Sequence, residues 1–215
     1  MADLGPTVPG TSAADERRRI YTASSPSGRL WQGEVLSELS QAKLALQCLP
    51  ATAPNQTNQT APVVKVEYDE HPLVIVLGQD CDLEQDYKRR NAVAAPFLWN
   101  ILLADVFEAE ALHAKLHAEE NTNSSEWRKI KENHTPRFQF LNQVSADQDA
   151  LGIGLPALAV DFRLYFSIRT DELYERLRLA LTKKRCRLQT PYAEHLAHRF
   201  HSYQSRVPLA REHGA

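Results

Sequence analysis

The sequence between residues 74 and 86 reads VIVLGQDCDLEQD and joins a short apolar run to a dense acidic one. The apolar run at 74–77 contains β-branched residues and predicts a buried strand that Gly78 ends. Acidic side chains follow at positions 80, 82, 84 and 86. Because buried unpaired charge is too costly, these carboxylates must face water, a cation or a basic partner. The stretch therefore predicts a strand with a candidate site at its carboxyl end.

The whole chain has the composition of an ordinary water-soluble globular protein. Its 215 residues are 43% hydrophobic and 24% charged, with a formal net charge of −2, so it is not a broadly nucleic-acid-binding polycation. The charge is uneven, because residues 163–212 carry eleven Lys and Arg against five Asp and Glu. We expect this basic tail to neutralise the acidic front part within the fold; binding of an outside anion is the alternative.

The location of the protein is inferred from what the sequence lacks. No run approaches the roughly 18 to 20 apolar residues that span a bilayer, and the first residues have no apolar core like that of a secretory signal. Three cysteines, Cys48, Cys81 and Cys186, are odd in number and far apart, so they predict no disulfide framework. We expect a cytoplasmic protein without a membrane partner.

Residues 1–28 are rich in Gly, Pro, Ser and Thr and predict a flexible N-terminal tail. Residues 29–209 predict a single α+β domain, with a polar loop at 50–62. The expected strands lie at 30–36, 63–68, 74–77, 97–107, 138–141 and 157–168, while 39–49 fits either a short helix or an edge strand. The expected helices follow at 108–120, at 126–132 with Ser125 as its cap, and in a C-terminal pair at 170–205. We expect a small barrel-like, mostly antiparallel β core with the C-terminal helices packed on it.

Cys81 is a candidate catalytic nucleophile, provided that a histidine or a helix N-terminus lies near it. Asp80 and Asp82 disfavour its thiolate unless arginine or metal pairs with them, and we expect Arg163 or Arg206 as partners. The alternative is a small structural cysteine packed in the core. If the chain is extended here, Asp80 and Asp82 lie on one side, where they are candidate ligands and catalytic groups for a divalent metal. A solvated acidic turn is the commoner use of this pattern.

A second candidate site is cationic. Lys183, Lys184, Arg185 and Arg187 predict a compact loop between the last two helices, suited to phosphate contacts. Together with Gln79 they are candidate binding residues for a protein partner or for nucleic acid. The alternative is a solvated charge run without a ligand.

The segment LGQDCDL at 77–83 resembles a motif in an uncharacterised group of bacterial proteins. In that group a hydrophobic strand runs into Ser/Gly-Gln/His-Asp-Cys-Asp-Leu, and the similarity extends over residues 30–209. The resemblance implies a shared fold and a marked site but no reaction. It also implies an association with stress, mobile-element, restriction or defence systems.

A fainter likeness is to the MazF/PemK barrels. The residues QGEVL at 32–36 resemble the Gly-acid-hydrophobic strand that opens that family, and HPLVIVL at 71–77 resembles its Pro-led strand. This implies an SH3-like barrel core. His71 stands where the family has arginine, and the catalytic residues have no match, so ribonuclease activity is not implied.

Two classes of function remain open. The first is a binding or regulatory component of a stress, mobile-element or defence system. The second is a nuclease-like hydrolase that uses Cys81 or the Asp80/Asp82 pair. The reactivity of Cys81 discriminates between them, because a catalytic thiolate reacts much faster than a packed thiol.

Overall fold

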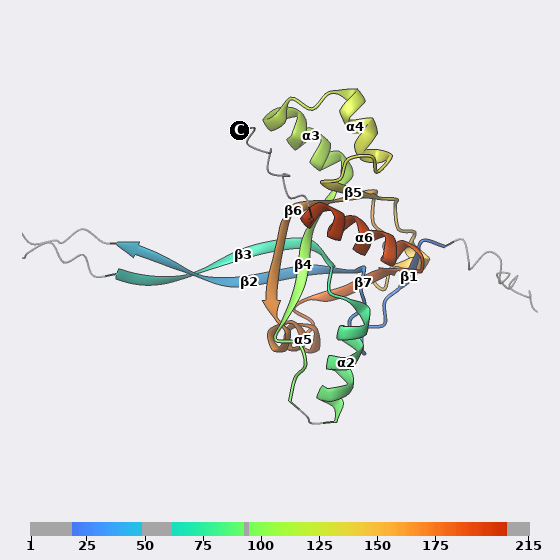
Figure 1. The fold of residues 1–215 in the computed structure, drawn as a ribbon. Coiled ribbons are helices and arrows are strands. Elements are labelled where there is room, and N and C mark those ends of the chain that lie inside the picture. Colours follow the sequence, from blue (N-terminus) through green and yellow to red (C-terminus); the bar gives the residue numbers. More distant parts are fainter. Residues whose placement is uncertain (1–18, 49–61, 93–94, 206–215) are drawn as a thin grey trace, which may run out of the picture.

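A computed structural model describes residues 19–48, 62–92 and 95–205 of the chain. One antiparallel sheet of seven strands runs through it in the order β1-β7-β2-β3-β4-β6-β5 (Figure 1). The strands are β1 (Tyr21–Ala23), β2 (Glu34–Cys48), β3 (Pro62–Val76), β4 (Asn100–Glu108), β5 (Phe138–Leu141), β6 (Leu158–Arg169) and β7 (Lys183–Leu188). The helices are α2 (Asp80–Asn91), α3 (Ala109–Glu120), α4 (Ser124–Lys131), α5 (Thr170–Arg178) and α6 (Tyr192–Gln204), with one 3-10 turn, η1 (Ala146–Gln148).

The predicted α+β class with an antiparallel sheet is confirmed, but the sheet is open. Among the described residues β1 and β5 are its two edges, so it does not close into the expected barrel. No helix in the described ranges is long and apolar enough to cross a membrane.

Helices cover both faces of the central strands, which explains the apolar run at 74–77. Ile75 faces the cluster that α6 completes through Leu196 and Phe200. Val74 and Val76 face the opposite cluster, which α2 and α5 complete through Leu83 and Leu173. Successive strand residues point to opposite faces, so a strand covered on both sides must be apolar at every position.

A third, smaller cluster lies at the β5–β6 end of the sheet. There α3 packs through Leu112 and Leu116, and α4 through Trp127 and Ile130, in a cluster with Phe138 of β5. Asn123, not the predicted Ser125, caps α4: its side chain accepts from the backbone N–H of Glu126, whose carboxylate accepts from the Asn123 N–H. This reciprocal pair is a capping box, which satisfies two backbone donors at once.

The structure corrects or refines three predicted segments. The expected tail at 1–28 ends too late, because Tyr21 is buried and β1 pairs with β7; residues 1–18 lie outside the described ranges. The part of 39–49 that is described, 39–48, is a strand, which was one of the two predicted alternatives. Strands β2 and β3 each join two predicted segments, because they pair in one constant register from Val35↔Ile75 to Cys48↔Pro62. The predicted loop at 50–62 lies outside the described residues except for Pro62, where β3 begins.

The C-terminal helical pair is interrupted by a strand. Helices α5 and α6 form where they were expected, but the residues between them are β7, which joins the sheet between β1 and β2. The stripe of α6 that packs on the core contains Leu196 and Phe200, as the helical spacing predicts.

The expected neutralisation of the acidic front part by the basic tail is found only in part, in the pairs Lys183–Glu38 and Lys184–Glu34. The acidic stretch at 67–86 pairs instead with bases of the front part itself: Arg29, Lys43, Lys65, Lys88 and Arg90.

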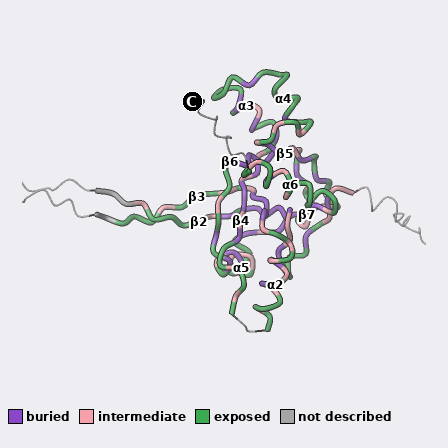
Figure 2. Tube along the Cα trace, viewed as in Figure 1, coloured by how far each residue is buried: buried purple, intermediate pink, exposed green. Residues whose placement is uncertain are grey.

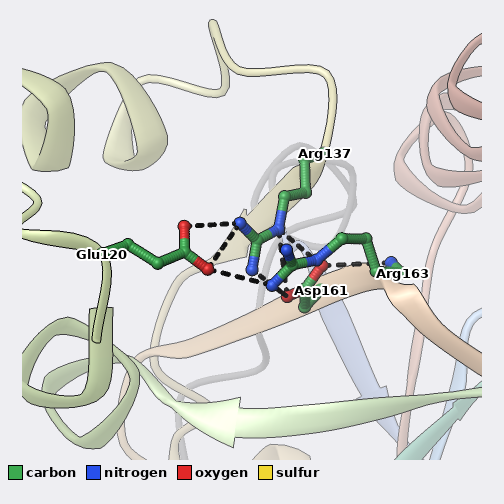
Figure 3. A network of polar contacts seen from close by, with 4 residues as sticks. All are labelled: Glu120, Arg137, Asp161 and Arg163. Atoms are coloured by element: carbon green, nitrogen blue, oxygen red, sulfur yellow. Dashed lines mark hydrogen bonds and ion pairs between the residues drawn. The ribbon is translucent and has the colours of Figure 1, made fainter.

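Other residues of the tail pair with carboxylates from the middle of the chain. Arg185 on β7 binds buried Asp149 through Nε at 2.8 Å and Nη2 at 2.7 Å. A second network joins the end of α3 to β6: Arg137 donates to both Glu120 and Asp161, and Arg163 reaches the same two carboxylates (Figure 3).

The Asp149–Arg185 pair makes stability depend on pH. Burial alone would raise the pKa of Asp149, but hydrogen bonds from Arg185 and from the backbone N–H groups of Leu151 and Gly154, with the charge of Arg185, lower it below 3.8. A carboxyl with a lowered folded-state pKa stabilises the fold above its unfolded pKa. That stabilisation is therefore lost as the pH falls from about 4 through the folded-state value.

We expect Asp149→Asn to lower the free energy of unfolding at neutral pH by about 3 to 5 kcal/mol, because it leaves Arg185 buried and unpaired. Urea unfolding at a series of pH values measures this loss, and the difference between variant and wild type should shrink below pH about 4. Asp147→Asn is the matched control, since Asp147 is exposed and should leave stability nearly unchanged. An equal loss in both variants would contradict the assignment.

Candidate functional site

The motif at 79–82 forms the start of a helix, not the extended acidic loop that the alternation suggested. Gln79 is the N-cap residue of α2, and Asp80 and Asp82 lie in its first turn, with basic residues in the last turn. This distribution complements the helix dipole. The spacing of Glu84 with Lys88 and of Asp86 with Arg90, both four apart and both ion-paired, was the sequence signal for a helix.

Asp80 has an arginine partner, but neither of those expected. Arg29 donates from Nη2 to Oδ2 of Asp80 at 2.9 Å and from Nη1 to its carbonyl at 3.0 Å. The backbone N–H of Gln32 approaches Oδ1 at 3.3 Å. Arg163 belongs to the network with Glu120 and Asp161, and Arg206 lies outside the described residues. Asp80 therefore ties the start of α2 to the segment that precedes β2.

Two arginines flank Trp31 beside Asp80. The guanidinium carbon of Arg29 lies 3.4 Å from the Trp31 ring centroid, and that of Arg187 lies 3.9 Å from it. Two groups at these distances cannot share one face of the ring, so the indole lies between them. Cation–π attraction supports both contacts. No sequence pattern connects residues 29, 31 and 187, which only the pairing of β7 with β2 brings together.

A cavity of about 280 Å³ opens against this stack. The residues around it come from β1, the start of α2, the end of β7 and the start of α6. They include Trp31, Gln32, Asp80, Arg187, Thr190 and Glu194. The cavity thus holds one residue of the predicted motif, Asp80, and one of the predicted cationic residues, Arg187.

Cys81 is exposed, so the prediction of a cysteine packed in the core is wrong for this residue. Its sulfur lies 3.8 Å from Oε1 of Gln79 and 3.7 Å from Oδ1 of Asp82. Gln79 is exposed as well. One of the two predicted conditions for a reactive thiol, a helix N-terminus, is therefore met, because Cys81 lies in the first turn of α2. The other is not met by these contacts, since the hydrogen-bond partners of the sulfur are an amide and a carboxylate and not an imidazole.

Asp80 and Asp82 do not share one side as they would in an extended chain. Residues two apart on a helix point in different directions, and Asp80 is held by Arg29. Within the described residues, no three His, Cys, Asp or Glu side chains come together as a metal site would require. The prediction of a divalent metal assumed that the two carboxylates lie on one side of an extended chain, and in the helix they do not.

The predicted cationic loop is wrong, because β7 buries two of its four basic residues. Lys184 donates to the carbonyls of Gly28 and Arg29 and lies 3.5 Å from Oε2 of buried Glu34. Burial lowers the pKa of Lys184 and raises that of Glu34, against their mutual attraction. Arg185 pairs with Asp149, so neither residue is free for a phosphate. Lys183 lies at the surface and pairs with Glu38.

A second candidate site is the ribbon that the outer parts of β2 and β3 form, residues 40–48 and 62–70, which we call the arm. β7 pairs with β2 only at 34–37, and β4 pairs with β3 only at 74–76. Beyond these residues the two strands have no other strand beside them in the described part of the chain. The arm therefore projects from the body as a two-stranded ribbon (Figure 1), and most of its residues at 40–45 and 64–70 are exposed (Figure 2).

The two faces of the arm differ in chemistry. Directly opposite residues of an antiparallel pair share a face, so the pairs Ala42↔Tyr68 and Leu44↔Val66 lie on one side. This apolar face is exposed: Leu44 by 72%, Tyr68 by 63%, Val64 by 56% and Val66 by 52%. The other face carries the ion pairs Lys43–Asp69 and Lys65–Glu67. The alternation of residues at 63–68 predicted a strand, but it did not predict that the apolar side of this strand would be exposed to solvent.

Comparison of the chain with protein-family models, with curated proteins and with solved structures finds no match. Inferences about function therefore rest on the sequence and the geometry above.

Two of the three cysteines, Cys81 and Cys186, should differ sharply in reactivity. Cys186 is buried, and burial raises its pKa to about 12, whereas Cys81 is exposed on the first turn of α2. We expect iodoacetamide at pH 8 to alkylate Cys81 and to spare Cys186 in the folded protein, with both alkylated in denaturant. Peptide mass spectrometry identifies the labelled residues. Alkylation of Cys81 no faster than of a free cysteine peptide supports the binding class, and a rate many times higher would support a catalytic thiol.

The two aspartates of the motif should differ in their effect on stability. Asp80→Ala removes the carboxylate that Arg29 and the Gln32 N–H contact, and we expect it to cost about 1 to 2 kcal/mol in free energy of unfolding. Asp82→Ala loses only its interaction with the helix N-terminus and should cost about 0.5 kcal/mol. Chemical denaturation of both variants measures the difference. Equal losses would show that the Arg29–Asp80 contact does not hold the start of α2.

Proposed function

We propose that the chain is a protein-binding component of a larger assembly and that the arm is its docking element. The carrying observation is the apolar face of the arm, which no described residue covers. A two-stranded ribbon in water is marginally stable alone, and contiguous exposed apolar side chains on a folded protein mark an interaction surface. A polypeptide whose apolar side chains pack on Leu44, Val66 and Tyr68 would both stabilise the ribbon and cover its exposed apolar surface.

The charges of the arm favour a protein over nucleic acid as its partner. In 40–45 and 64–70 the arm carries two lysines against Glu67, Asp69 and Glu70. A phosphate backbone requires a cationic surface, and this one is slightly acidic. The free edges of β2 and β3 also offer backbone N–H and C=O groups to an added strand.

The first function class is therefore preferred to the second. A binding component of a stress, mobile-element or defence system agrees with the arm and with the resemblance of LGQDCDL to bacterial proteins of such systems. For a hydrolase, Cys81 has the helix N-terminus that was predicted, but the hydrogen-bond partners of its sulfur among the described residues are Gln79 and Asp82, so no imidazole is placed to act as its base.

Site-specific photo-crosslinking tests the proposal in cells that express the full chain. A benzophenone amino acid replaces Tyr68 on the apolar face or, as the matched control, its neighbour Glu67 on the charged face. We expect a discrete protein adduct from position 68 and little from position 67, because adjacent strand residues face opposite ways.

The double substitution Leu44→Asp/Val66→Asp should abolish the adduct from position 68. The double substitution Lys43→Gln/Asp69→Asn on the other face should leave it intact. Mass spectrometry of the adduct identifies the partner, and a second copy of the chain would establish self-association through the arm. Absence of an adduct from position 68, or equal adducts from both positions, would refute docking through the apolar face.

A further inference from the structure

The cavity beside Trp31 lies on the body of the protein and is lined by none of the arm residues. Its volume of about 280 Å³ falls just below the usual range for drug-sized ligands, about 300 to 1,000 Å³, and fits a small metabolite. Trp31, Asp80, Arg187, Gln189, Thr190 and Glu194 are among its lining residues, so its wall combines apolar surface with polar groups of both signs of charge.

Arg187 is the residue in this wall whose bonding is incomplete. Its guanidinium stacks on Trp31, yet within the described residues no carboxylate pairs with it and no acceptor takes its N–H groups. Arg29 on the opposite face of the same ring is, by contrast, paired with Asp80. A half-buried guanidinium held flat against an indole is preorganised, and its fork of donors matches the two oxygens of a carboxylate.

The same lining also supplies acceptors, from Glu194 at the exposed start of α6 and from Asp80 at the start of α2. Oε1 of Glu194 accepts a hydrogen bond from the Thr190 hydroxyl at 2.8 Å, and its second oxygen has no donor among the described residues. Asp80 adds a second carboxylate, already engaged by Arg29 and Gln32. A doubly charged phosphate would meet these two negative groups with only one unpaired arginine to offset them, so a single carboxylate is the better match.

We propose that this cavity binds a small carboxylate that also carries amino or hydroxyl groups, such as a free amino acid. The carboxylate pairs with Arg187, and the donor groups of the ligand bind Glu194. The site is independent of docking through the arm, since the two share no residue, and either one can fail without the other.

Thermal unfolding of the full chain, with direct ligand titration by saturation-transfer NMR, tests the site. The probes are glycine, L-serine, L-lactate, acetate and inorganic phosphate. At saturating concentrations, about 100 times Kd, a bound amino acid should raise Tm by about 5 to 10 °C. Acetate, which lacks donor groups for Glu194, should give a smaller rise.

Arg187→Gln should abolish both the Tm rise and the NMR signal for the carboxylates. Glu194→Gln should remove the preference for glycine and L-serine over acetate. Arg178→Gln, at an exposed arginine on α5 outside the cavity, is the matched control and should bind like wild type. The NMR titration keeps the result interpretable if loss of the Trp31 stack destabilises Arg187→Gln. Absence of carboxylate binding in the wild type, unchanged binding in Arg187→Gln, or a preference for phosphate would overturn the proposal.

Discussion

The pairing of β2 with β3 in a single register is the constraint on which the rest of the structure depends. In the body, this pairing places Val35 beside Ile75 within the core, where helices cover the sheet on both faces. The same register continues beyond Glu38, which forms no pair, and the two strands become the arm. Burial of the inner part fixes the register, because a slip by one residue would turn every side chain to the wrong face. The core therefore determines which side chains the arm displays.

Local patterns in the sequence predicted the elements better than they predicted their connections. Three predictions succeeded because the spacing of apolar residues shows directly which side of an element is buried. They are the strand at 74–77, the strand at 157–168 and the two helices near the C-terminus. The strand β7 was missed because KKRCRL carries more charge than a buried strand usually does. Only distant partners, Asp149 for Arg185 and Glu34 for Lys184, make that burial tolerable, and no local window contains them.

At the candidate site, too, local features could be predicted from the sequence and contacts between distant residues could not. The alternation of acidic residues after Gly78 was interpreted as extended chain, although the ion-pair spacing at 84–90 already indicated a helix. An arginine partner for Asp80 could be predicted, because an unpaired charge is costly. The sequence did not indicate that this partner is Arg29. This contact depends on how the segment before β2 passes the start of α2. Trp31 and Arg187 meet only because β2 and β7 are adjacent strands, which is a property of the sheet order.

Glu38 marks the point where the arm leaves the body. It has a left-handed backbone conformation, with φ of 61°, and Leu36 and Leu39 lie on the same side of the sheet although they are three residues apart. The alternation thus changes phase once, at the boundary, and then stays regular outward. The length of the arm can therefore change almost independently of the structure of the body. Two residues gained or lost on each strand would extend or shorten its reach by about 7 Å and leave the same chemistry on the same side, without disturbing the core. A chain with a longer or shorter arm would in this way hold the same apolar face at a different distance from the same body.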